Sequence, residues 1–503
     1  MKRTLISAFA SVISSKVIKL LILAVSTPIL VRILGPRLYG EYAAVMAVFA
    51  LLMILVSSGI SSGGQKYLAE ERADTAWKAQ VFNYYLRIAT VLALFASVLL
   101  LAVTEFGVVE SVFQPHYAVY FYLLAILAFA AQFREYARRC LMGLKLEHYS
   151  EPITVLYKLI FAVFAISLAY LGYGVVGVLS GHIIASLTAF AIGALIIARH
   201  IDLRAAMKPL PEDFPRSELR SFNNLSILYF FLLTSLYHVD VLMLELFTTS
   251  ETVGYYKAAL VMAQFLWFVP KSVQAILIQS TADLWANDRI EEINSISSKV
   301  TRYTALISLL LAIGLAALAQ DVVPLYYGAD FAPAVVPLLL LLPGTIGFAV
   351  ARPLLAITHA KGAMGIMIGA TGVSAGLNLV LNLILIPPFG MAGAAIATSI
   401  GYGSLPIVHI IAARRVGYAP LADVRPIRIT TTAVLSAVGI FGLAHLIDNI
   451  FIAIILVPPI GLILFTVLSF VTGAIGAREV LRIVNGLPFP TGRTSALLES
   501  RLN

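Results

Sequence analysis

Apolar runs of about 20 residues, separated by short polar connections, recur from one end of the chain to the other. An α-helix of about 20 residues crosses the roughly 30 Å hydrocarbon core of a bilayer. A transmembrane β-barrel is excluded, because its strands are about ten residues long and alternate in polarity. We therefore expect an all-α, polytopic membrane protein. The predicted transmembrane helices span residues 14–34, 41–62, 83–104, 117–137, 153–171, 174–198, 222–247, 255–281, 301–320, 333–358, 363–386, 390–413, 429–447 and 451–474.

Lysine and arginine are concentrated in every second connection between these fourteen helices. One set begins with Lys2 and Arg3 and is rich in both residue types, whereas the intervening set carries Arg37 and almost no other cation before Lys257. Cytoplasmic connections of membrane proteins carry the excess of Lys and Arg. The alternation predicts that both termini lie in the cytoplasm. It also accounts for the net charge of +9 without nucleic-acid binding.

The composition agrees with a chain that lies mostly within a membrane. Of 503 residues, 60% are hydrophobic and 12% are charged, against about 25% charged residues in soluble domains. The N-terminus begins like a signal peptide, but Lys16 and Lys19 interrupt its apolar stretch, which favours a retained first helix. Cys140 is the only cysteine, so neither an intramolecular disulfide nor a cysteine-rich metal site is expected.

The chain contains an internal repeat. "YGEYAAV" at 39–45 aligns with "VGYYKAA" at 253–259, and "YGVVG" at 173–177 aligns with "FGMAG" at 389–393. The offsets are 214 and 216 residues, so the register is kept across most of six helices. Six is an even number, so both halves enter the membrane from the cytoplasm. We expect two parallel, pseudo-twofold six-helix lobes that rock around a shared cavity.

The repeat also sets the expected domain organisation. Residues 1–198 form an N-terminal lobe, 199–221 a cytoplasmic linker, 222–413 a C-terminal lobe, 414–474 helices 13 and 14, and 475–503 a cytoplasmic tail.

Two hairpins of the chain resemble a known family. "TPILVRILGPRLYGEYAAVMAVFALL" is similar to the opening hairpin of the Wzx-like polysaccharide transporters, and "YHVDVLMLELFTTSETVGYYKAAL" to the matching hairpin of their second lobe. That family belongs to the multidrug/oligosaccharidyl-lipid/polysaccharide (MOP) exporter superfamily, which also contains the MATE transporters. An Asp is common in the family where Asp240 stands, followed after about fourteen residues by a turn like that of Gly254 and Tyr256.

The resemblance implies a MATE-like fold and a flippase in the cytoplasmic (plasma) membrane of a prokaryote. Its substrate would be an oligosaccharide linked to a polyprenyl (pyro)phosphate, with undecaprenyl or dolichyl as the lipid. Its partners would be this substrate, membrane lipids and glycan-assembly enzymes.

Six cations lie well inside the predicted spans, in their cytoplasmic half or near the midplane: Lys16, Lys19, Arg87, Lys158, Lys271 and Arg352. Ionisable groups inside a membrane are costly and by default mark a pathway. Lys16, Lys158 and Arg87 are close enough to helix ends to reach the inner headgroups instead. Lys19, Lys271 and Arg352 lie deeper, and we expect them to line the cavity and to hold phosphate oxygens by charge-assisted hydrogen bonds.

Two acids lie in the outer half of the seventh helix. Asp240 and Glu245 are candidates for binding a coupling Na⁺ or H⁺, or for repelling the phosphate toward release. Alternatively, Asp240 pairs with a cation on the first or eighth helix and holds the lobe together. Asn378 and Asn382, one helical turn apart, either contact the sugar or pack between helices. The lone histidines His182 and His409 are expected to be packing residues.

The chain lacks the motifs of an enzyme. In "GISSGGQK" at 59–66, Gln65 stands where a phosphate-binding loop needs its lysine. We therefore expect no cofactor and no metal centre, and energy input from an ion gradient or from the substrate's own gradient. The preferred hypothesis is a lipid-linked oligosaccharide flippase. The alternatives are a MATE-like drug or cation antiporter, and a membrane glycan polymerase or ligase, which typically needs a large outer loop.

Overall fold

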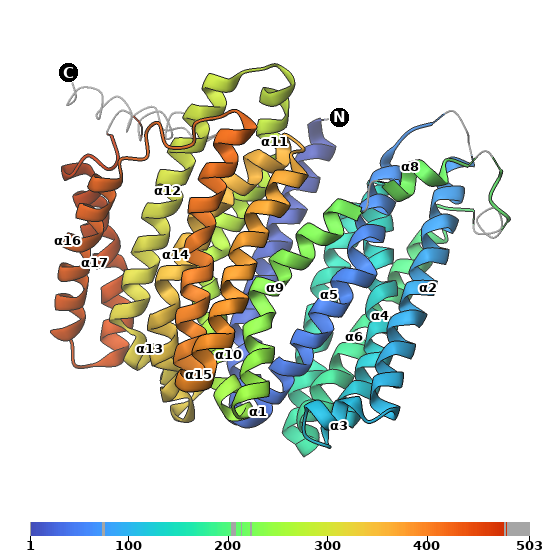
Figure 1. Ribbon diagram of the computed structural model, residues 1–503, viewed down its shortest axis with the longest axis horizontal. Coiled ribbons are helices and arrows are strands. Elements are labelled where there is room, and N and C mark those ends of the chain that lie inside the picture. Colours follow the sequence, from blue (N-terminus) through green and yellow to red (C-terminus); the bar gives the residue numbers. More distant parts are fainter. Residues whose placement is uncertain are drawn as a thin grey trace. The chain divides into compact units, whose positions relative to one another are not determined.

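The regular structure is helical throughout the part of the chain that the computed structural model describes, which is residues 2–72, 76–202, 208–212, 214–221, 224–476 and 479 (Figure 1). The all-α prediction is thus confirmed. The α-helices are α1 (Lys2–Ala69), α2 (Trp77–Glu105), α3 (Val108–Val112), α4 (Tyr117–Gly143), α5 (Glu147–Leu168), α6 (Gly174–Ile197), α8 (Arg216–Ser221), α9 (Asn224–Phe247), α10 (Ser250–Gln264), α11 (Phe268–Ala286), α12 (Ile290–Ala317), α13 (Ala319–Tyr327), α14 (Val335–Ala360), α15 (Met364–Val416), α16 (Pro426–His445) and α17 (Ile450–Val471).

The chain divides into two compact units. Unit 1 comprises Met1–Val261, Pro324–Leu340 and Met364–Gly401, and unit 2 comprises Met262–Val323, Leu341–Ala363 and Tyr402–Asn503. The two six-helix lobes expected from the repeat remain a prediction.

Eleven helical stretches of the described chain are long and apolar enough to span a membrane. Three of them exceed 40 residues, more than one crossing needs: the 41 residues of Val17–Ser57 would extend about 60 Å, twice the hydrocarbon thickness. Each of the three contains glycine in a left-handed backbone conformation, at Gly35 (φ 68°), at Gly172 and Gly174 (φ 92° and 52°) and at Gly390 (φ 53°). In Figure 1, α1 accordingly descends to a tight turn and then reverses. Counting each such stretch as two crossings accommodates the fourteen predicted helices.

Several predicted boundaries differ from the observed ones. α12 begins at Ile290, well before the predicted residue 301, because the polar segment after Arg289 continues the helix. The predicted outer connection around Pro324 contains the short helix α13, whose first turn is favoured by Asp321. The predicted linker contains α8.

The two glycines that revealed the repeat lie in direct contact. A Cβ on Gly40 of α1 would lie 1.6 Å from the Ser250 carbonyl oxygen, and one on Gly254 of α10 would lie 1.9 Å from the Pro36 carbonyl oxygen. Only glycine permits backbones to approach this closely. The turns at 36–40 and 250–254 therefore pack backbone to backbone within unit 1.

A charge network joins α12 of unit 2 to the segments that flank α16 and α17. The fully buried Arg302 of α12 pairs with Asp423 at 3.0 Å and with Glu479 at 2.6 Å. Arg425, which precedes α16, pairs with the same two acids at 2.7 and 3.1 Å. Because each acid is shared by two arginines, no charge in this network is left without a partner.

Candidate functional site

Asp240 of α9 is fully buried among hydroxyl groups from two other helices of unit 1. Its Oδ2 accepts hydrogen bonds from the Tyr256 hydroxyl of α10 and, at 3.1 Å, from Thr398 Oγ1 of α15. Its Oδ1 accepts from the Val241 backbone N–H at 2.8 Å. The Asn378 amide of α15 donates to Thr398 Oγ1 at 3.3 Å, so three helices meet in one hydrogen-bonded cluster.

Asn382 extends this cluster by one helical turn, on the same face of α15 as Asn378. It is fully buried, and among the described residues neither its amide oxygen nor its amide nitrogen has a hydrogen-bond partner. A buried amide without partners is costly, and a bound cation or water would relieve that cost. Asp240, Tyr256, Thr398, Asn378 and Asn382 are called the Asp240 cluster below.

The donor atoms of the Asp240 cluster fit a hard monovalent cation. It offers carboxylate, hydroxyl and amide oxygens, which hard cations prefer. Across the described part of the chain, no three His, Cys, Asp or Glu residues lie together as a transition-metal site would require. The alternative interpretation of Asp240 requires a cation on the first or eighth predicted helix. Lys257 on the eighth helix meets this requirement, because it interacts electrostatically with Asp240. The structure thus brings Asp240 together with Asn378 and Asn382, which the sequence analysis treated separately, and the role of each residue remains a prediction.

Glu245 lies one to two turns beyond Asp240 and has different partners. Its Oε1 accepts hydrogen bonds from the Tyr117 hydroxyl of α4 and from Ser250 Oγ, both at 2.7 Å. These bonds tie α4 to the ends of α9 and α10. Glu245 thus has a clear structural use, and its predicted role in ion coupling or release is untested.

The two deep cations of unit 2 share one aromatic side chain. Arg352 of α14 is 4% exposed and donates to Gln274 Oε1 of α11 at 2.8 Å. Its guanidinium lies 4.7 Å from the Phe348 ring centre and 5.1 Å from that of Trp267. Lys271 Nζ lies 5.3 Å from the same Trp267 ring, on an exposed side chain. An amide and aromatic faces thus hold two cations close together.

The cations of the first five helices form a second group, in unit 1. Lys19 of α1 pairs with Glu151 of α5 at 2.9 Å. Lys158 of α5 lies 5.6 Å from the Tyr157 ring centre, and the guanidinium of Arg134 of α4 lies 4.2 Å from the same ring. Lys19 therefore has an acidic partner, whereas Lys158 and Arg134 both lie near the same neutral aromatic ring.

One predicted cation lies apart from these groups. Arg87 is exposed and donates to Asn83 Oδ1 of its own helix at 2.8 Å, and it also reaches the Lys208 carbonyl at 3.5 Å. This position, beside the linker that contains Lys208, agrees with the interpretation that Arg87 reaches the headgroups of the inner leaflet. The side chain of Lys16 lies outside the described residues.

Two residues of unit 1 have surroundings that sequence reasoning did not identify. Arg134 lies near the end of the predicted span 117–137. The criterion that selected the other six cations, a Lys or Arg inside a predicted span, also selects Arg134. His182 of α6, which we expect to be a satisfied packing residue, has both ring nitrogens hydrogen-bonded: Nε2 with the Tyr42 hydroxyl at 2.9 Å and Nδ1 with the Tyr157 hydroxyl at 3.0 Å. No sequence signal identifies these partners, because they lie 140 and 25 residues away.

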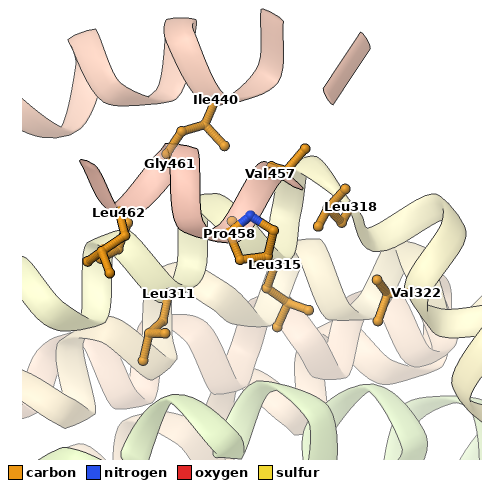
Figure 2. Close-up of a pocket in the computed structure, with 11 residues that line it drawn as sticks. Leu311, Leu315, Leu318, Val322, Ile440, Val457, Pro458, Gly461 and Leu462 are labelled. Atoms are coloured by element: carbon orange, nitrogen blue, oxygen red, sulfur yellow. The ribbon is translucent and has the colours of Figure 1, made fainter. Parts of the chain in front are cut away.

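Unit 2 carries an apolar groove of about 380 Å³ between α12, α13, α16 and α17 (Figure 2). Leu311, Leu315, Val457, Pro458 and Leu462 surround it in the close-up, and every residue that lines it is apolar. The groove is therefore suited to a hydrocarbon chain and to no polar ligand.

Comparison with known proteins identifies relatives by sequence. Residues 5–281 match the family described as "polysaccharide biosynthesis protein". An uncharacterized membrane protein of Methanocaldococcus jannaschii is 24% identical over 460 residues, which cover 85% of this chain and 88% of that protein. A probable low-salt glycan biosynthesis flippase of Haloferax volcanii is 24% identical over 175 residues, 34% of this chain and 36% of that protein.

Solved structures with the same fold include two transporters. The lipid II flippase MurJ, in an inward closed conformation, superimposes with a TM-score of 0.73 at 15% identity, over 93% of this chain and 98% of that one. An inward-facing MATE multidrug resistance transporter of the MOP superfamily gives a TM-score of 0.65 at 15% identity, over 80% and 98% of the two chains. The chain thus has the MOP exporter fold that the sequence predicted.

Proposed function

The chain belongs to the polysaccharide biosynthesis protein family, and from this premise we propose that it is a flippase for lipid-linked oligosaccharide. It would move an oligosaccharide linked to a polyprenyl (pyro)phosphate across the cytoplasmic membrane of a prokaryote by alternating access. The product would serve surface polysaccharide or glycoprotein biosynthesis.

The observation that carries this proposal is a set of membrane-embedded cations held by neutral groups. Arg352 lies against Gln274 and two aromatic rings, and Arg134 and Lys158 lie against Tyr157. Amide and aromatic partners position a cation without neutralising it. Such cations are suited to phosphate oxygens, to which arginine donates two parallel hydrogen bonds. A pyrophosphate entering from the inner leaflet would satisfy them.

The apolar groove supports the same substrate class, since a polyprenyl phosphate is an amphiphile. We propose that the groove between α12, α13, α16 and α17 takes the polyprenyl chain. Burial of hydrocarbon there brings little gain over the bilayer itself, which is equally apolar. The groove would therefore guide the chain rather than bind it tightly, while the phosphate contacts supply the affinity.

For coupling, the Asp240 cluster is the proposed site of Na⁺ or H⁺. Asp240 would supply the negative charge, and Thr398, Asn378 and Asn382 the neutral oxygens. Tyr256 on α10 and Thr398 on α15 donate hydrogen bonds to Asp240 on α9. Loss of the cation would therefore change how α10 and α15 are held to α9.

Two other functions are less well supported. A MATE-like antiporter of cationic drugs shares the fold, but cationic drugs favour acidic clefts, and the cations described above oppose them. A polymerase or ligase typically needs a large outer loop with catalytic residues, and no connection among the described residues reaches that size.

Deletion of the gene, followed by analysis of surface glycans and of lipid-linked intermediates, tests the proposal. We expect under-glycosylated surface products and accumulation of the intermediates on the cytoplasmic side, both reversed by the wild-type gene. Normal glycosylation without accumulation, in a strain that has no second flippase, would contradict it.

A further inference from the structure

The repeat register relates the Asp240 cluster to a second polar site in the N-terminal half. The offset of 214 residues pairs Tyr42 with Tyr256, and the offset of 216 residues pairs His182 with Thr398. The structure contains the same contact in both halves. The Tyr42 hydroxyl lies 2.9 Å from His182 Nε2, and the Tyr256 hydroxyl lies 3.1 Å from Thr398 Oγ1. The position that carries a hydroxyl beside Asp240 in one half therefore carries an imidazole in the other.

We propose that His182, held between Tyr42 and Tyr157, is a proton-binding site, and that it takes up its proton when a phosphate or pyrophosphate group is held by Arg134 and Lys158. The anion in this inference is the headgroup of the proposed flippase substrate, so the inference rests on that proposed function. The proton site itself rests on the hydrogen bonds and charges around His182.

The hydrogen bonds around His182 suit both protonation states. A neutral imidazole needs one donor and one acceptor, and an imidazolium needs two acceptors. The hydroxyls of Tyr42 and Tyr157 can each donate or accept, because the O–H bond rotates. Both contacts therefore persist when the ring gains a proton. His182 is 7% exposed and stacks on Phe161 at 3.8 Å between ring centres, so water does not compete freely for these bonds.

The charges that face His182 explain why uptake needs an anion. Tyr42 faces it from α1, Tyr157 and Lys158 from α5, and Arg134 from α4. Both charged groups are cations, which oppose a third positive charge in a low-dielectric region. An anion bound to Arg134 and Lys158 removes that opposition. The imidazole then binds a proton from the aqueous side from which the substrate entered, and it returns the proton to water when the anion leaves.

This linkage is measurable as proton uptake upon anion binding. Calorimetric titration of the full-length protein in detergent with inorganic pyrophosphate, in buffers of different ionisation enthalpy, gives the number of protons taken up per anion. We expect about one more proton for the wild type near neutral pH than for His182→Gln, since one imidazole titrates. His409→Gln is the matched control, a buried histidine on α15, and should behave like the wild type.

Equal proton counts for the wild type and His182→Gln, with pyrophosphate still bound, would overturn the proton site while leaving headgroup binding intact. Absence of pyrophosphate binding to the wild type would overturn both. If His182→Gln does not fold, Tyr157→Phe provides the second test. It keeps the imidazole but removes one acceptor of the imidazolium, so the midpoint of proton uptake should move about one pH unit toward acid, as expected for a lost hydrogen bond to a charged group. An unchanged midpoint would count against the proposal.

Discussion

Of the two deep cations predicted in unit 2, Arg352 has better-defined surroundings than Lys271. Gln274 and the rings of Trp267 and Phe348 fix its guanidinium. We predict that Arg352→Ala abolishes complementation of a deletion strain, whereas Arg352→Lys retains part of it, because lysine keeps the charge but loses the planar, bidentate donor. Surface glycan per unit of membrane-inserted protein is the measurement. Lys361→Ala, a cation at the end of the same helix, is the control. Full complementation by Arg352→Ala would remove Arg352 from the site.

Asp240 should determine the response of the protein to the coupling ion. Binding of Na⁺ to the folded state alone would stabilise it by about 2.7 kcal/mol at one hundred times the dissociation constant. We therefore expect a higher Tm in NaCl than in choline chloride for the wild type, and no difference for Asp240→Asn, which keeps the shape but loses the charge. Glu251→Gln, which alters an exposed acid bonded to Tyr255, should keep the wild-type response. An equal Tm in both salts for the wild type would exclude Na⁺ and leave H⁺ or the substrate's own gradient as the energy source.

At the scale of elements, the contact between α1 and α10 depends on two glycines. A methyl group on Gly40 would meet the Ser250 carbonyl, and one on Gly254 would meet that of Pro36. Gly40→Ala and Gly254→Ala should each lower the stability by about 1–3 kcal/mol, the usual cost of overpacking, and reduce transport. Gly376→Ala in α15, whose added Cβ would meet nothing within 4 Å, is the control. Thermal unfolding in detergent distinguishes them, and equal Tm values for Gly40→Ala and the control would contradict the close contact.

A second prediction at the scale of elements concerns Pro28, which lies inside α1. Proline has no N–H, so the carbonyl of Ala24 lacks its partner within the helix. The Tyr326 hydroxyl donates to that carbonyl at 2.9 Å. Tyr326→Phe should therefore destabilise the protein by about 1–3 kcal/mol, the cost of an unpaired buried acceptor. In a Pro28→Ala background, where residue 28 can donate to Ala24, the same substitution should cost much less. Additive effects in this double-mutant cycle would show that the tyrosine acts elsewhere.

For the whole molecule, hydrophobic pattern and turn residues predicted most of the fold. Gly35, Gly172 and Gly390 reverse the chain where the sequence placed helix ends, because positive φ favours glycine. The hydrophobic pattern did not predict helix boundaries where a polar segment is helical, as before residue 301, because charged residues alone do not end a helix. For the candidate site, the sequence indicated residues whose own chemistry is informative, as for Asp240, and their roles stay predictions. It could not indicate partners that come from other helices, as for His182 and its two tyrosines.

The orientation of the whole molecule is the premise of the proposed mechanism, and it is testable directly. The alternation of Lys and Arg predicts that the α2–α3 connection faces outward and that His200, after α6, faces the cytoplasm. The native Cys140 is buried, and a Cys140→Ala background removes it entirely. Phe106 is 84% exposed and His200 is also exposed. On intact cells, a membrane-impermeant maleimide should label Phe106→Cys but not His200→Cys, and permeabilised cells should label both.

The reverse labelling pattern would place the cytoplasmic ends of α4, α5 and α14 on the outer side. Arg134, Lys158 and Arg352 would then lie closer to the outer leaflet than to the inner one. Since lipid-linked oligosaccharides to be exported begin on the cytoplasmic face, such cations would retain the headgroup after transfer instead of capturing it before. Labelling at residue 106 therefore decides whether these side chains are suited to entry of the substrate or only to its exit.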